Sequence, residues 1–178
     1  MHLNVGVWPF VLIGFTIAQR MAELALSARH ARRVRALGAR EYGLGHFPLI
    51  VAVHTLLPIA LVLEIARYHT HPSPAWPWWL LVWVSAQVLR YAAIRALGDR
   101  WNVRVLVVPG MAPVHAGVYR WLRHPNYVAI VLELIAAPMI FGAWRTALVV
   151  GALNAVALTL RIRCENDALQ RAAVDSSR

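Results

Sequence analysis

Two clusters of polar side chains stand beside apolar runs of the chain, where they could form a binding site. One cluster comes just before an apolar run that begins near residue 127, and the other follows a second run that ends near residue 162. In chain order they contain His115, Tyr119, Arg123, His124 and Tyr127, and then Arg161, Arg163, Glu165, Asn166 and Asp167. Arginine can pair with a carboxylate through two hydrogen bonds, and histidine can exchange a proton near neutral pH. These residue types therefore fit a site that binds a charged ligand.

A simpler interpretation is that each of these residues only anchors the end of a helix. Arginine and tyrosine are common at the ends of membrane helices, and a proline is well tolerated in the first turn of a helix. Anchoring does not explain the combination, however. Arg123 and His124 directly precede Pro125, Tyr127 follows two residues later, and an acidic cluster ends the next apolar run.

The composition indicates a protein that resides in lipid. The chain has 178 residues, of which 60% are apolar, and its mean hydropathy is +0.54. This apolar share exceeds that of ordinary soluble domains. The net charge of +10 does not favour nucleic-acid binding, because the basic residues fall in blocks between apolar segments. Cys164 is the only cysteine, which excludes an intrachain disulfide and a cysteine-based metal cluster.

Five apolar segments predict an all-α integral membrane protein with about five transmembrane helices. In lipid every backbone polar group needs an internal partner, so such runs should be helical. The fourth segment is short for a full crossing, which takes about 20 residues. Only Gly142 and Ala143 separate it from the fifth, so the two should form a helical hairpin whose open ends bring both polar clusters together. The segments cover about residues 4–26, 46–66, 76–97, 127–142 and 144–162.

The loops between these segments alternate between arginine-rich and arginine-poor. The rich stretches are 27–43, 98–126 and 161–178, and the poor ones contain Arg67 or Arg145 alone. The positive-inside rule then places the N-terminus outside, and the C-terminus and the polar clusters on the cytoplasmic side. No signal peptide is evident, and the first segment is expected to be a retained helix.

We expect a single domain, 1–178, with its catalytic part at about 98–170. The connection 98–126 carries a β-branched run, a Pro-Gly turn signal and a second short apolar stretch. This pattern predicts a small hairpin or an extended segment on the membrane surface.

Several polar residues fall inside the apolar segments, where ionisable groups are costly and often functional. They are His54, Gln87, Arg90 and Glu133. We expect them to pair with one another, for example Arg90 with Glu133; the alternative is that some line a tunnel for a lipid tail. His46 and His54 lie eight residues apart and are too few to form a metal site, so no metal is predicted.

The stretch HAGVYRWLRHPNY, followed by a helical hairpin and RIRCEN, resembles the isoprenylcysteine carboxyl methyltransferase family of integral membrane enzymes. That family's pattern is roughly G-x-Y-x-x-x-R-H-P-x-Y, a hairpin, and R-x-x-x-E-E. The matching residues are Gly117, Tyr119, Arg123, His124, Pro125 and Tyr127, and then Arg161 and Glu165. Asn166 replaces the second acidic residue. Met111 stands where eukaryotic members often have a histidine, and His115 follows four residues later.

The resemblance implies transfer of a methyl group from S-adenosylmethionine to a lipophilic acceptor at the membrane surface. Arg123 would bind the donor's carboxylate, and Glu165 its ammonium or ribose hydroxyls. The segment from Met111 to Val114, with Tyr119, would line the adenine pocket, and His124, Pro125 and Tyr127 would shape its wall.

Arg161 would hold the acceptor's oxyanion, by analogy with the family. Alignment and desolvation can suffice for an acceptor that is already ionised. Otherwise His115 or His124 would serve as the base.

The expected acceptor has an apolar tail and a small acidic head, either an isoprenylcysteine carboxylate or a phenolic or pyrone polyketide lipid. The absence of lysine and the five-segment size favour a bacterial inner-membrane protein. The alternatives are an NADPH-dependent reductase of the sterol type, a phospholipid N-methyltransferase and a non-enzymatic membrane scaffold. The sequence predicts no oligomeric state.

Overall fold

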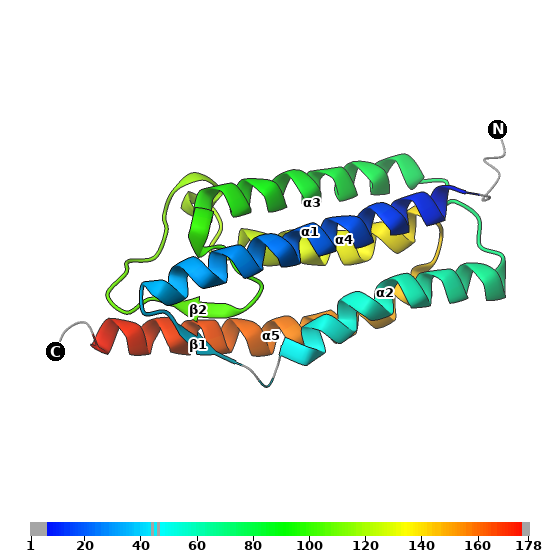
Figure 1. Ribbon diagram of the computed structural model, residues 1–178. Coiled ribbons are helices and arrows are strands. Elements are labelled where there is room, and N and C mark those ends of the chain that lie inside the picture. Colours follow the sequence, from blue (N-terminus) through cyan, green and yellow to red (C-terminus); the bar gives the residue numbers. More distant parts are fainter. Residues whose placement is uncertain (1–6, 44, 46, 176–178) are drawn as a thin grey trace.

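The computed structural model describes residues 7–43, 45 and 47–175 and shows five α-helices lying side by side (Figure 1). The prediction of an all-α membrane protein with five helices is confirmed. His46 and the first residues of the predicted segment 4–26 lie outside the described residues. The helices are α1 (Trp8–Ala36), α2 (Phe47–Tyr68), α3 (Trp76–Leu97), α4 (Pro125–Ile140) and α5 (Trp144–Asp175).

Four of these helices are long and apolar enough to cross a membrane: α1, α2, α3 with its extension to Arg100, and α5. Helix α4 is apolar but has 16 residues, so it is shorter than a full crossing requires. Helices α1 and α5 continue past residues 26 and 162, where the sequence ended the segments. The apolar run marks only the part that suits lipid, whereas the backbone hydrogen bonds of a helix can continue into the polar residues beyond it.

Helices α3, α4 and α5 pack in sequence order, and α2 packs on α5. The alanines Ala86 and Ala93 of α3, and Ala129 and Ala136 of α4, are completely buried. Such small side chains let neighbouring membrane helices approach closely. Side chains of α2, α4 and α5 form an apolar cluster of the core, which includes Tyr127. The first turn of α4, which carries part of the predicted site, is therefore anchored in the core.

The turn between α4 and α5 contains Gly142, whose φ of +69° lies in the left-handed region. A Cβ at this position would lie 2.6 Å from the carbonyl oxygen of His71, in the connection between α2 and α3. Only glycine fits both the backbone conformation and the contact. The predicted hairpin therefore depends on this residue.

We expect Gly142→Ala to destabilise the protein by more than about 1 kcal/mol, because it adds left-handed strain to a backbone clash. This loss corresponds to a fall of roughly 2–4 °C or more in the thermal midpoint, measured on purified protein in detergent. Gly151→Ala in α5 is the matched control, since a Cβ there meets nothing within 4 Å. Equal midpoints for the two variants would contradict the expectation.

The connection between α3 and α4 does not form the hairpin that its sequence favoured. Its strand β2 (Val105–Val107) pairs antiparallel with β1 (Arg40–Tyr42), which follows α1. The second apolar stretch, after the Pro-Gly turn, is not a strand among the described residues. Val105 and Val107 instead pack on Ala168 and Ala172 of α5. Burial against α5 thus favours a strand partner that is distant in the sequence. Two 3-10 helices, η1 (Gly98–Arg100) and η2 (Gly117–Arg120), complete this connection.

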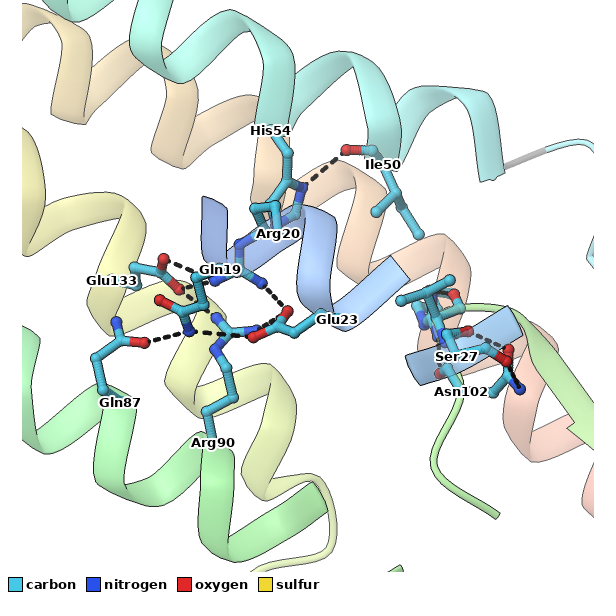
Figure 2. A network of polar contacts seen from close by, with 12 residues as sticks. Gln19, Arg20, Glu23, Ser27, Ile50, His54, Gln87, Arg90, Asn102 and Glu133 are labelled. Atoms are coloured by element: carbon cyan, nitrogen blue, oxygen red, sulfur yellow. Dashed lines mark hydrogen bonds and ion pairs between the residues drawn. The ribbon is translucent and has the colours of Figure 1, made fainter. Parts of the chain in front are cut away.

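A network of charged and amide side chains joins α1, α3 and α4 inside the bundle (Figure 2). The predicted pairing of Arg90 with Glu133 is confirmed, since Arg90 donates a hydrogen bond to the Glu133 carboxylate. Arg20 of α1 donates to both oxygens of Glu133, at 2.7 and 2.6 Å, and to Glu23 at 2.6 Å. Arg90 also pairs with Glu23, at 3.6 Å. Two arginines and two glutamates therefore balance one another.

Amide side chains extend this network on α1 and α3. Gln19 donates to Gln87 at 2.6 Å and to Glu23 at 3.1 Å. His54 of α2 donates instead to the carbonyl of Ile50 in its own helix, at 2.8 Å.

Helix α1 turns a polar face inward and leaves apolar residues such as Phe10 and Ile17 exposed. This arrangement is expected in lipid, where unpaired polar groups are more costly than exposed apolar ones.

Candidate functional site

A cavity of about 470 Å³ lies where the connection between α3 and α4 meets the start of α4 and the second half of α5. Its size falls in the range of small-molecule and cofactor sites. Nine of the residues predicted for the site line it. They are Met111, Val114, His115, Tyr119, Arg123, His124, Tyr127, Arg161 and Glu165. Their roles remain predictions, but the expected meeting of the two polar clusters is present in the structure.

Two predicted residues, Gly117 and Pro125, are not part of the cavity lining. Gly117 opens η2 with a φ of +55°, and a Cβ there would lie 3.2 Å from the Cβ of Ala96 in α3. Pro125 is buried in the first turn of α4, directly after His124. Both residues shape the backbone that carries the lining side chains.

Three side chains form a linked group in the wall of the cavity. Arg161 and Glu165 lie four residues apart on α5, which places them on one face of the helix. Arg161 Nε donates to the Tyr127 hydroxyl oxygen at 2.9 Å, and the Tyr127 hydroxyl donates to the Glu165 carboxylate. The tyrosine therefore bridges the arginine and the glutamate. Tyr127 and Arg161 are buried, with 8% and 7% of their surfaces exposed.

Backbone carbonyl groups hold the other end of the Arg161 guanidinium. Nη1 donates to the Val103 carbonyl at 2.5 Å, and Nη2 donates to the Asn102 carbonyl at 3.4 Å. A guanidinium has more N–H groups than these three bonds use. Arg161 is therefore fixed in place and keeps donor capacity for a ligand.

The start of α4 forms a second wall of the cavity. The His124 ring stacks on the Tyr127 ring, with the ring centres 5.2 Å apart and the planes at 14°. Pro125 begins the helix at this point, which brings the two rings onto one side of its first turn. The aromatic surface beside the cavity follows from the His-Pro-x-Tyr spacing.

Most of the charged side chains that line the cavity are positive. Four arginines, Arg100, Arg104, Arg123 and Arg161, line it, and among the described residues Glu165 is its only carboxylate. Burial, with a smaller effect of the Glu165 charge, raises the pKa of Tyr119, so this phenol stays neutral at physiological pH. The cavity thus offers several cationic sites and one anionic site.

The cavity also contains residues that sequence reasoning did not select. Arg100 donates to the Ala112 carbonyl at 2.7 Å and so holds the segment from Met111 to Val114 against η1. Asn102 and Asn126 also line the cavity. The only sequence signal for Arg100 and Asn102 was a polar stretch directly after the third apolar segment, which was counted as loop charge.

Comparisons with known proteins agree with the motif. The model of the isoprenylcysteine carboxyl methyltransferase (ICMT) family matches residues 79–171. The protein YpbQ of Bacillus subtilis (strain 168) is 39% identical over 93% of this chain and 98% of its own length. A Haemophilus influenzae protein is 27% identical over 90% of this chain and 95% of its own length. Both relatives are described as uncharacterized proteins. No solved structure matches.

Proposed function

The chain belongs to the isoprenylcysteine carboxyl methyltransferase family, and from this premise we propose that it O-methylates a lipophilic acceptor at the membrane surface. Family membership implies an integral membrane methyltransferase that uses S-adenosylmethionine. The observation that carries the finer proposal is the cavity, in which the two halves of the motif meet and one carboxylate faces several arginines.

The residues of the cavity fit the methyl donor. S-Adenosylmethionine supplies an activated methyl group on a sulfonium and carries an amino-acid end with opposite charges. Arg123 would bind the donor's carboxylate, and Glu165 its ammonium or ribose hydroxyls. Glu165 is the only carboxylate in the described lining, which supports this role for it. The segment from Met111 to Val114, with Tyr119, would border the adenine.

Arg161 would orient the acceptor, using the N–H groups left over from its bonds to Tyr127, Asn102 and Val103. A carboxylate or an acidic phenol arrives wholly or partly ionised, so alignment of its oxygen and exclusion of water are the main demands on the protein. His115 or His124 would take the proton of an acceptor that arrives neutral. We propose an isoprenylcysteine-type carboxylate or a phenolic or pyrone lipid as the acceptor.

We propose that the cavity opens on the cytoplasmic side. The strands β1 and β2 and the last turns of α5 lie at one end of the bundle, and α1 begins at the other end (Figure 1). The residues that line the cavity belong to segments at the first end, among them β2 and the connection after it. The arginine-rich stretches of the sequence gather at the first end, which the positive-inside rule assigns to the cytoplasm.

A second candidate activity is reduction with NADPH, and the four arginines of the cavity favour it because they could bind phosphates. A dinucleotide is much larger than S-adenosylmethionine, and a cavity of about 470 Å³ suits the smaller ligand better. The methyltransferase proposal therefore fits better.

We expect the purified protein in detergent to bind S-adenosylhomocysteine and not NADPH, as measured by isothermal titration calorimetry. Incubation with methyl-labelled S-adenosylmethionine and total membrane lipid should label a lipid that lacks a phosphate headgroup. Binding of NADPH alone would overturn the proposal. Label in phospholipid would identify a phospholipid N-methyltransferase instead.

A further inference from the structure

Ser27 of α1 contacts the segment that follows α3 through three hydrogen bonds (Figure 2). Its hydroxyl donates to the Asn102 side-chain oxygen at 2.7 Å and accepts from the Val103 N–H at 3.1 Å. The Asn102 amide donates back to the Ser27 carbonyl at 3.2 Å. One turn later, His30 donates to the carbonyl of Trp101 at 2.9 Å. Ser27 is 3% exposed, so these bonds are shielded from water.

The same segment holds the cavity's arginine on its other side. The carbonyl groups of Asn102 and Val103 accept hydrogen bonds from Arg161. The N–H of Val103 therefore binds Ser27 while the carbonyl of Val103 binds Arg161. A shift of this residue would move both bonds, and it would also displace the Arg161 contact to Tyr127.

We propose that Ser27 is a positioning residue for methyl transfer, which acts through Asn102 and Val103 on the guanidinium of Arg161. Ser27 does not line the cavity, and it lies before the region 79–171 that matches the family model. The proposal rests on the proposed function and adds a role for α1, a helix that the motif does not include.

The chemistry of the contact favours positioning over simple packing. Alanine fills almost the same space as serine, so Ser27→Ala removes little apolar contact. It leaves the half-buried N–H of Val103 without its acceptor and removes the hydroxyl that donates to the Asn102 side-chain oxygen. Asn102 keeps the bond from its amide to the backbone carbonyl of residue 27 and the weaker contact from the Arg104 N–H, at 3.3 Å. A misplacement of about 1 Å in an aligned site can cost up to about 10²-fold in rate.

The test combines Ser27→Ala with Arg161→Lys, which keeps the positive charge but loses the paired bonds to the carbonyls. The probes are S-adenosylhomocysteine for binding, and N-acetyl-S-farnesylcysteine and pentadecylresorcinol as acceptors of the labelled methyl group. We expect Ser27→Ala to lower kcat about 10-fold, with the donor KM and the affinity for S-adenosylhomocysteine changed by less than about threefold. In the Arg161→Lys background Ser27→Ala should lower kcat by less than about twofold.

Two further variants separate positioning from a general loss of structure. Ser27→Thr keeps the hydroxyl and should retain most of the wild-type kcat. Thr16→Ala removes a hydroxyl of the same helix that donates within α1, to the Leu12 carbonyl, and should leave kcat unchanged.

A wild-type kcat in Ser27→Ala would overturn the inference about Ser27 but not the proposed function. An equal loss of kcat from Ser27→Ala in the wild-type and Arg161→Lys backgrounds would do the same. A wild-type protein that binds no S-adenosylhomocysteine, or that methylates neither probe, would overturn the proposed function and this inference with it.

Discussion

Glu165→Ala is expected to lower methyl transfer by at least about 10²-fold while the protein still inserts into the membrane. Glu165 is the only carboxylate in the described lining of a cavity that four arginines share. Its removal leaves the Tyr127 hydroxyl without its acceptor and, under the proposed function, would also leave the donor's ammonium without a counter-charge. Transfer of labelled methyl groups into lipid measures the rate, and recovery in the membrane fraction measures insertion.

Asp167→Asn is the matched control for this prediction. Asp167 is an exposed carboxylate on the same helix, two residues further on, and does not line the cavity. We expect it to keep nearly wild-type activity. If Glu165→Ala turned over at the wild-type rate, Glu165 would be excluded from the site.

Glu133→Gln is expected to destabilise the protein by roughly 3–5 kcal/mol. The substitution keeps the size of the side chain but removes a charge that Arg20 and Arg90 share inside the bundle. The side chain of Glu133 is 3% exposed and that of Arg90 is 1% exposed, so water cannot replace the lost partner. The thermal midpoint in detergent, compared with that of the wild type, measures the loss.

Glu41→Gln provides a surface comparison, because Glu41 also has two arginine partners. They are Arg35 at 2.5 Å and Arg104 at 2.6 Å, but both of those side chains are more than 40% exposed. We expect a loss of at most about 1 kcal/mol, because exposed ion pairs contribute little. A loss as large as that of Glu133→Gln would contradict the explanation by burial.

Hydropathy predicted the helices well because the apolar runs are local features of the chain. The hairpin at Gly142 followed from two adjacent apolar segments, and the start of α4 followed from Pro125. The end of α1 was placed ten residues too early, at residue 26 instead of Ala36, because its last turns are polar. Hydropathy identifies the part of a helix that suits lipid, and not the polar turns by which the helix continues beyond it.

The residues of the candidate site were predicted from the motif, and the structure shows which hydrogen bonds hold their side chains in place. The spacing of Arg161 and Glu165 places them on one helical face whatever the tertiary fold. That Tyr127 bridges them, and that two backbone carbonyls fix Arg161, depends on the packing of α4 on α5 and on the path of the connection after α3.

By itself, the sequence determined the membrane setting, the helices and the residues of the motif, because hydropathy and short-range spacing are encoded locally. Only the tertiary structure decided which distant groups meet. Arg20 joined Glu133, β2 paired with β1 instead of its own neighbour, and Ser27 reached Asn102. Each of these contacts joins residues more than 60 positions apart. Which partners meet depends on how the helices pack, since a polar group buried in lipid must be satisfied by whichever partner the packing brings near.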